Sequence, residues 1–201
     1  TIYIVSGHDE EVGGNGAKEA AKLLESRGVK ALMTVDEGSA VITNAPVINK
    51  SAIMIGVAEK GYATLKIVAN APGGHSSMPP KEIGSVNVAK AIVAINEKQF
   101  ASEIRPPVSA MLETLAAEKG GSTKMAVANQ WLFGGKVRDQ IGATPSGAAM
   151  MHTTIAPTMM TGSPKENVLP QTATALINYR IAPWQTSKDV MARAKEAVGK
   201  L

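Results

Sequence analysis

The chain of 201 residues contains no cysteine, and aromatic residues make up only 3% of it. Without cysteine, neither a disulfide framework nor a thiolate metal site can form, so a transition metal would have to bind to His, Asp or Glu. Because 44% of the residues are nevertheless hydrophobic, we expect one or two domains with cores of small aliphatic residues and methionine.

Long apolar runs and blocks of like charge are also missing. No stretch approaches the roughly 18 apolar residues of a membrane span, and no signal peptide opens the chain. The formal charge is +4, but basic and acidic residues are interleaved, so we expect no nucleic-acid partner. Thr1 stands directly before an apolar run, without an initiator methionine. We therefore expect a piece of a longer polypeptide, whose cellular location the sequence leaves open.

An acidic loop that ends in two glycines follows the first apolar run. Residues 2–5 are β-branched or aromatic and predict a buried strand, and residues 8–11 read His-Asp-Glu-Glu before Gly13 and Gly14. Open α/β sheets bind ligands at the carboxyl ends of their strands, which would give these acids a function. The alternative is a solvated turn whose acids cap a helix, and the local run by itself favours neither interpretation.

A second strand is predicted at residues 31–35, after a helix over residues 16–27 that Asn15 or Gly14 caps and Gly28 ends. Strand, helix and strand at this spacing indicate a βαβ unit with parallel strands. Both acidic clusters would then lie at one sheet edge, where their repulsion favours protons or metal ions. The acids concerned are Glu10, Glu11, Asp36 and Glu37.

From residue 61 onward the pattern changes to strand, helix, helical insertion, two strands and a helix. This order lacks only a last strand of a ferredoxin-like βαββαβ sandwich, so we expect an open sheet edge and self-association. The predicted strands of this part are 62–69, 150–160 and 172–181, and one further strand is predicted before it, at 53–58. The predicted helices are 85–97, two or three pieces within 106–141 broken at Gly120–Gly121 and Gly134–Gly135, and 187–198.

Five motifs follow one another in the order and spacing of a known family. They are residues 7–14 (GHDEEVGG), 35–38 (VDEG), 74–80 (GHSSMPP), 167–170 (NVLP) and 178–183 (NYRIAP). With them the chain resembles, over essentially its whole length, the zinc exopeptidases that include carboxypeptidase S, aminoacylase, acetylornithine deacetylase and glutamate carboxypeptidase. It is most similar to the carboxypeptidase S branch, the peptidase M20 group that cleaves or makes N-acyl amino acids.

The resemblance implies an α/β plus α+β fold in two parts. Residues 1–58 would be part of a three-layer catalytic domain, and residues 59–201 a ferredoxin-like lid and dimerisation domain with a helical insertion and its last strand missing. The implied activity is hydrolysis of an amide bond next to a free carboxylate, in a peptide or N-acyl amino acid. The implied cofactor is zinc, two ions in the complete site, and the implied partner is a second copy bound through the lid.

The resemblance also assigns roles to the acids. Glu10 would be the general base that takes a proton from a metal-bridging water, because neighbouring residues at a strand end point different ways and can divide two tasks. Glu11 would bind one zinc ion and Glu37 the other. Asp9 and Asp36 are expected to cap backbone groups or support the ligands rather than to bind metal.

Three residues of the second part receive roles in the same way. His75 would polarise the scissile carbonyl and stabilise the oxyanion, reaching across the dimer. Asn167 and Arg180 would hold the substrate, Arg180 by gripping a carboxylate with two hydrogen bonds. Without the resemblance they would be a loop hydrogen-bonder, a turn asparagine and a strand-surface arginine. Similarly, residues 131–133 (Trp-Leu-Phe) could line a pocket, although we favour a place in the core.

The chain departs from the family pattern in its ligand set. It has three histidines, His8, His75 and His152, none in the context of the family's zinc-binding histidines, and the bridging aspartate is missing. Two carboxylates make a poor zinc site, so we expect this chain by itself to be inactive and to hold no di-zinc centre. The competing hypothesis is an interaction module with no catalysis of its own. A nucleotide-binding domain is disfavoured because acids before the helix would repel phosphate.

Overall fold

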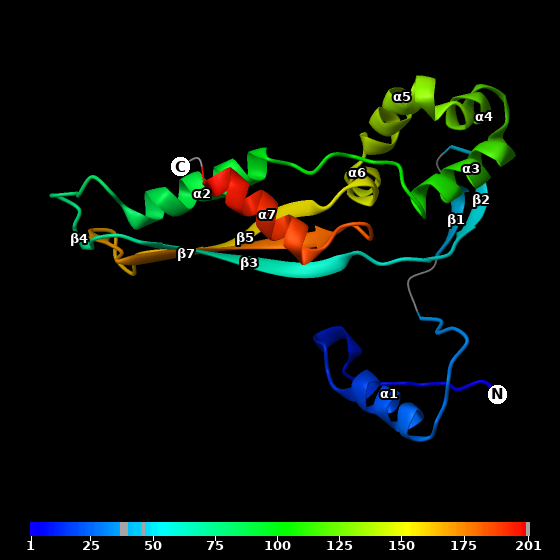
Figure 1. Cartoon of the computed structure of the whole chain (residues 1–201), viewed down its shortest axis with the longest axis horizontal. Coiled ribbons are helices and arrows are strands. Elements are labelled where there is room, and N and C mark those ends of the chain that lie inside the picture. Colours follow the sequence, from blue (N-terminus) through cyan, green and yellow to red (C-terminus); the bar gives the residue numbers. More distant parts are fainter. Residues whose placement is uncertain (37–39, 46, 200–201) are drawn as a thin grey trace. The chain divides into compact units, whose positions relative to one another are not determined.

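The computed structural model describes residues 1–36, 40–45 and 47–199. Two compact units divide the chain, Thr1–Gly38 and Ser39–Leu201. Figure 1 gives the labels of the helices and strands in each unit.

The first unit consists of a short 3-10 helix, η1 (Glu10–Val12), and helix α1 (Gly16–Ser26). Helix α1 lies where the sequence predicts it, with Asn15 as its N-cap residue. The chain turns out of the helix at Gly28, whose φ of 70° is a left-handed conformation that glycine adopts without a steric penalty. The predicted helix is therefore confirmed, with its end at Ser26, one residue before the predicted one.

The two strands predicted on either side of α1 are wrong. Residues 2–5 and 31–35 form no ladder, and the side chains of Ile4 and Leu32 are 93% and 96% exposed. A strand needs hydrogen bonds to a neighbouring strand, and the described residues of this unit contain no such neighbour. The β propensity of these residues therefore produces no strand. The predicted βαβ unit, with the sheet edge that would gather the acids, is consequently absent from the described residues.

A three-stranded antiparallel sheet is the centre of the second unit. Its order is β3 (Gly61–Asn70), β7 (Thr172–Ile181) and β5 (Thr154–Thr161). The ladder between β3 and β7 runs unbroken from Gly61 opposite Ile181 to Asn70 opposite Thr172. Helices α2 (Gly84–Glu97) and α7 (Ser187–Val198) lie together over one face of this sheet (Figure 1).

The residues of β7 alternate between the covered and the bare face of the sheet. Ile177 and Tyr179 are 0% and 1% exposed and pack in a core with residues of α2 and α7. Leu176 and Asn178, on the other face, are only partly covered. Burial of Tyr179 raises the pKa of its phenol. The buried residues of β7 thus recur at every second position, the period of a strand that is covered on one face.

A helical insertion separates α2 from β5. It contains α3 (Val108–Lys119), α4 (Gly121–Ala128), α5 (Gln130–Gly142) and α6 (Pro145–Met151), and α3 to α5 share a core of their own. The break at Gly120–Gly121 is confirmed. The break at Gly134–Gly135 is wrong, because both glycines lie inside α5 and Gly134 is buried. The strand predicted from residue 150 begins later because α6 continues to Met151.

Two small two-stranded sheets complete the second unit. Strand β1 (Ala40–Ala45) pairs with β2 (Lys50–Met54), and the Nζ of Lys50 lies 2.6 Å from a carboxylate oxygen of Glu118 at the end of α3. Strand β4 (Gly74–His75) pairs with β6 (Val168–Leu169). The second of these pairs is the one that matters for the candidate site.

The structure agrees with the predicted fold class at the level of a mixed α/β chain with antiparallel sheets. Within the residues it describes, every helix is too short or too polar to span a lipid bilayer.

Candidate functional site

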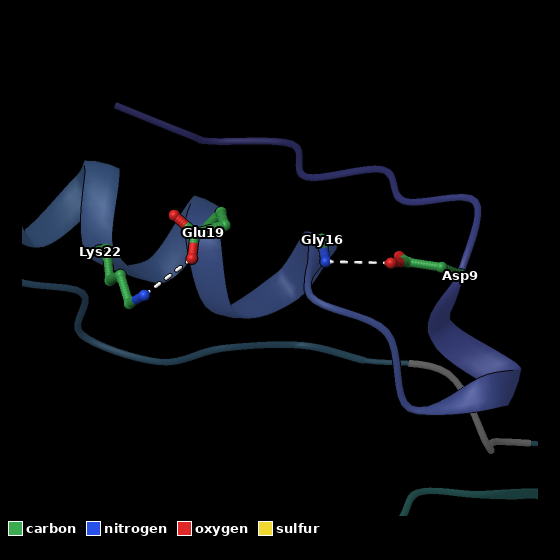
Figure 2. Close-up of polar contacts among 4 residues, drawn as sticks. All are labelled: Asp9, Gly16, Glu19 and Lys22. Atoms are coloured by element: carbon green, nitrogen blue, oxygen red, sulfur yellow. Dashed lines mark hydrogen bonds and ion pairs between the residues drawn. The ribbon is translucent and has the colours of Figure 1, made fainter.

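The acidic loop of the first unit is built by contacts within a few residues. A carboxylate oxygen of Asp9 accepts hydrogen bonds from the backbone N–H groups of Asn15, at 2.9 Å, and Gly16, at 3.3 Å. Figure 2 shows the contact with Gly16. These groups lie at the start of α1 and have no partner within the helix, so Asp9 caps α1 from six residues upstream. The capping role expected for Asp9 is what the structure shows.

Two glycines allow this loop to close. Gly13 has a φ of 66°, and its N–H donates to the carbonyl oxygen of Glu10 at 2.9 Å. A Cβ atom on Gly14 would lie 1.9 Å from Oδ2 of Asp9, far inside van der Waals contact. A side chain at position 14 is therefore incompatible with this position of Asp9.

The capped loop leaves Glu10 and Glu11 on η1, both with exposed side chains. Their expected partner Glu37 lies outside the described residues. Among the residues that the structure describes, no three histidine or acidic side chains come close enough to hold a metal ion together. The described residues thus supply at most part of a metal site.

The second unit brings together two predicted site residues that are far apart in the sequence. His75 on β4 pairs with Val168 on β6, and the N–H of Ser76 donates to the carbonyl oxygen of Asn167 at 3.0 Å. As a result, the side-chain nitrogen Nδ2 of Asn167 lies 3.5 Å from Nε2 of His75. The short β4–β6 ladder is what places these two residues, which we call the His75–Asn167 pair.

Contacts on the other side of the imidazole fit one tautomer of the neutral ring. The backbone N–H of Ser77 donates to Nδ1 of His75 at 3.2 Å, and Oγ of Ser77 lies 2.8 Å from the same nitrogen. A backbone N–H can only donate, so Nδ1 carries the lone pair and the proton of the neutral ring sits on Nε2. The ring thereby presents an N–H donor on the side of Asn167.

The amide of Asn167 lies beside this donor. Its nitrogen Nδ2, also a donor, is 3.5 Å from Nε2 of His75, so an acceptor atom placed between them would receive hydrogen bonds from both. An open hollow of about 610 Å³ lies next to the β4–β6 ladder that carries the pair. Residues 73–74 and 168–172 form most of its lining.

Arg180 occupies the opposite end of the long ladder. Its guanidinium carbon lies 5.0 Å from the centre of the Tyr62 ring, which faces it across the β3–β7 pair. Extended strand separates Arg180 from Thr172 by about 26 Å, at 3.3 Å per residue. Because β4 and β6 lie beyond the Thr172 end, Arg180 and the His75–Asn167 pair cannot contact one small ligand within a single chain.

A second cation accompanies Arg180. The Nζ of Lys60 donates to the carbonyl oxygens of Ala149 and His152, at 2.9 and 2.8 Å, around the end of α6. Burial and then the charge of Arg180 lower the pKa of Lys60, and burial and then the charge of Lys60 lower the pKa of His152. This end of the sheet therefore has an electropositive character.

The sequence patterns did not identify Ser77 and Tyr62 as contacts of site residues. Ser77 stands two positions after His75, so its contact with Nδ1 could have been suspected from spacing. Tyr62 faces Arg180 only through the register of β3 and β7, which no local pattern reveals. In residues 131–133, Phe133 packs in the insertion core as expected, but Trp131 and Leu132 are 83% and 60% exposed.

Comparisons with known proteins agree with the family resemblance of the five sequence motifs. The sequence profile of the peptidase dimerisation domain (M20_dimer) matches residues 57–201. N-fatty-acyl-amino acid synthase/hydrolase PM20D1.1 of Danio rerio is 39% identical over 202 residues, covering 98% of this chain and 39% of its own length. Carboxypeptidase S of Saccharomyces cerevisiae is 28% identical over 218 residues, covering 100% of this chain and 36% of its own.

The chain thus spans about two fifths of the length of the curated relatives it matches. Among solved structures, an M20 family metallo-carboxypeptidase from Sulfolobus solfataricus overlaps 71% of this chain and 40% of its own, at 15% identity and a TM-score of 0.39. This structural likeness is partial.

Proposed function

Because the chain belongs to the M20 peptidase dimerisation domain family, we propose that it forms the lid and dimerisation part of a zinc-dependent amidohydrolase. The proposed reaction is hydrolysis of an amide bond next to a free carboxylate, in a peptide or an N-acyl amino acid. The observation that carries the proposal is the His75–Asn167 pair, in which a side-chain amide lies 3.5 Å from Nε2 of the imidazole.

His75 is suited to stabilising an oxyanion. With Nδ1 occupied by the N–H of Ser77, Nε2–H is a donor whose position is fixed by β4. A donor held in place beforehand stabilises the negative charge that develops on a carbonyl oxygen during amide cleavage. Asn167, beside it, would add a second hydrogen-bonding group for the substrate.

Arg180 is suited to binding the free carboxylate, since its planar guanidinium forms paired hydrogen bonds with carboxylates and Lys60 adds positive charge nearby. The span of about 26 Å along the strand separates it from the His75–Asn167 pair. We therefore propose that the two groups of one chain serve different active sites, and that each site of a homodimer combines Arg180 of one chain with His75 of the other.

The metal-binding roles remain part of the proposal. Glu10 would act as the general base, and Glu11 and Glu37 would each bind one of two zinc ions, which would polarise the amide and activate water. Support comes from the adjacent, exposed positions of Glu10 and Glu11 on η1.

The division into a partial catalytic segment, residues 1–58, and a lid, residues 59–201, is proposed on similar grounds. The match of the dimerisation-domain profile to residues 57–201 supports it, as does the strand order β3-β7-β5, which is that of the first three strands of a ferredoxin-like sheet.

A direct test uses the longer polypeptide that contains this chain. His75→Ala should lower kcat by about 10²- to 10³-fold, the usual cost of losing one oxyanion donor. Arg180→Ala should raise KM for substrates with a free carboxylate more than KM for the corresponding amides. Lys66→Ala, an exposed cation in the middle of β3, is the matched control and should change neither constant. An unchanged kcat in His75→Ala would refute the catalytic role.

The alternative is that this chain is an interaction module without catalysis of its own. We propose that the 201-residue chain alone is inactive, because the residues assigned to the metals are too few for the three or four protein ligands of a zinc site. The test combines a metal assay with turnover of an N-acyl amino acid by the isolated chain. Stoichiometric zinc together with turnover would overturn this proposal and leave the role of the longer protein intact.

A further inference from the structure

The corner between α4 and α5 exposes large apolar side chains. Trp131, Leu132 and Met125 are 83%, 60% and 54% exposed, although Phe133 of the same run packs inward. We call these three residues the apolar corner. A tryptophan exposed to this degree next to an exposed leucine, with an exposed methionine six residues earlier, leaves more apolar surface in water than single scattered residues do.

The surroundings of the apolar corner are basic. The chain has 21 Lys and Arg against 17 Asp and Glu, an excess of four basic residues. Residues 119–138 contain four basic residues and no acidic one, so this segment accounts for a number equal to that excess. Of the acids that flank this segment, Glu118 is paired with Lys50 at 2.6 Å, and Asp139 follows directly. The four cations, all with exposed side chains, are Lys119, Lys124, Lys136 and Arg138.

On α5, helical spacing places apolar and basic side chains on the same side of the helix. Phe133 and Val137, four residues apart, face the insertion core. On the outer side, Leu132 and Lys136 are four residues apart and Trp131 and Arg138 seven apart, so each apolar residue shares a side of the helix with a cation. The outer face of α5 is thus apolar in the first turn and carries Lys136 and Arg138 farther on, together with exposed Asp139, seven residues after Leu132.

We propose that the α4–α5 corner docks on an anionic lipid surface. Tryptophan is favoured at the boundary between lipid and water because it combines a large apolar ring with an N–H donor, and flanking Lys and Arg are attracted to anionic headgroups. A lipid surface satisfies both features together. A protein partner would need an apolar pocket surrounded by acids, and a second copy of this segment would repel the first through the same four cations.

Vesicle binding by the 201-residue chain tests the proposal. The chain should sediment with vesicles of about 30% phosphatidylserine in phosphatidylcholine at least about tenfold more than with pure phosphatidylcholine. Raising the salt to about 0.5 M should largely release it, because screening weakens attraction between exposed charges. In a Trp184→Phe background, the fluorescence of Trp131, the remaining tryptophan, should shift to the blue on binding.

Two variants separate the contributions, and each has a matched control. Trp131→Ser/Leu132→Ser should reduce binding several-fold, whereas Met159→Ser/Met160→Ser, on exposed residues of β5, should not. Lys124→Gln/Lys136→Gln/Arg138→Gln should abolish the preference for phosphatidylserine, whereas Lys90→Gln/Lys188→Gln/Lys195→Gln, with equal loss of charge on α2 and α7, should retain it. All of these side chains are exposed, so the fold should persist.

Several results would overturn the proposal. These are equal binding to both vesicle types, unchanged binding by Trp131→Ser/Leu132→Ser, or an equal loss in the two charge variants, which would indicate unspecific adsorption. If the apolar variant instead converts a dimer to a monomer in light scattering without changing vesicle binding, a second copy covers the corner and the lipid proposal fails.

Discussion

The acidic loop of residues 9–16 and the His75–Asn167 pair both contain residues that the sequence assigns to an active site, but the two are built in different ways. Asp9 bonds to backbone groups six and seven residues away, so the loop is assembled by its own sequence. His75 and Asn167 are 92 residues apart and meet only because β4 pairs with β6. The loop should therefore persist when the core is weakened, and the pair should not.

The two regions also differ in how many buried residues surround them. No residue of η1 or α1 is buried, whereas the second unit encloses Ile177, Tyr179 and other residues under α2 and α7. Local hydrogen bonds order the first region, and apolar burial positions the second. Four changes should sharpen this contrast.

The largest effect is expected from the core. Ile177→Ala removes a side chain with 0% exposure and should lower the free energy of unfolding of the second unit by about 2–5 kcal/mol. Leu176→Ala, on the bare face of the same strand, should cost clearly less. Urea unfolding measures both, and NMR signals of residues 9–16 should stay in place. Their loss together with the core would mean that the loop depends on the second unit.

The reverse experiment alters the loop. Gly14→Ala places a Cβ atom 1.9 Å from Oδ2 of Asp9, so the loop should be destabilised by about 1–3 kcal/mol and the signals at the start of α1 should shift. Gly56→Ala, where no atom lies within 4 Å of the new Cβ, is the control. The melting temperature of the second unit should not change, and a decrease would contradict the separation of the two regions.

A milder change removes only the cap. Asp9→Ala should reduce the stability of α1 by about 0.5–2 kcal/mol, because two backbone N–H groups lose their acceptor. Asp9→Asn keeps an oxygen acceptor and should retain most of the helix. Circular dichroism and amide exchange of residues 15–20 measure the difference. Equal helix content in the two variants would show that the hydrogen bonds of Asp9 contribute nothing.

The smallest effect concerns pH. Burial and the charge of Lys60 lower the pKa of His152 in the folded state, so on acidification through about pH 6.5 the unfolded state takes up a proton first. Stability of the second unit should therefore fall as the pH drops from about 7.5 through 6.5 and stop falling once the folded state is protonated as well. His152→Asn should flatten this part of the stability curve. A slope that the substitution leaves unchanged would assign it to other groups.

Much of the second unit could be predicted from local patterns. Helix α7 has the predicted bounds, Ser187–Val198, and its start is fixed by a capping box in which Thr186 and Asp189 exchange hydrogen bonds. Strand β7 also has its predicted bounds, Thr172–Ile181. Helix caps and the alternation of side chains along a strand depend on interactions within a few residues, so they can be recognised in the sequence.

The failures have a common cause. Residues 2–5 have strong β propensity, but a strand requires a neighbour that local patterns cannot supply. Gly134 resembles a helix break but is buried inside α5, because packing overrides propensity. Trp131 resembles a core residue and is exposed. In each case the outcome depends on which segment packs against which.

The sequence by itself determined the positions of α1, α7 and β7 and the local hydrogen bonds that close the acidic loop, since interactions over a few residues decide them. Only the tertiary structure decided that His75 meets Asn167, that Tyr62 faces Arg180, and that Arg180 lies about 26 Å along the strand from Thr172. These facts depend on strand register and on pairing across many residues, and the register is set by burial of the whole core.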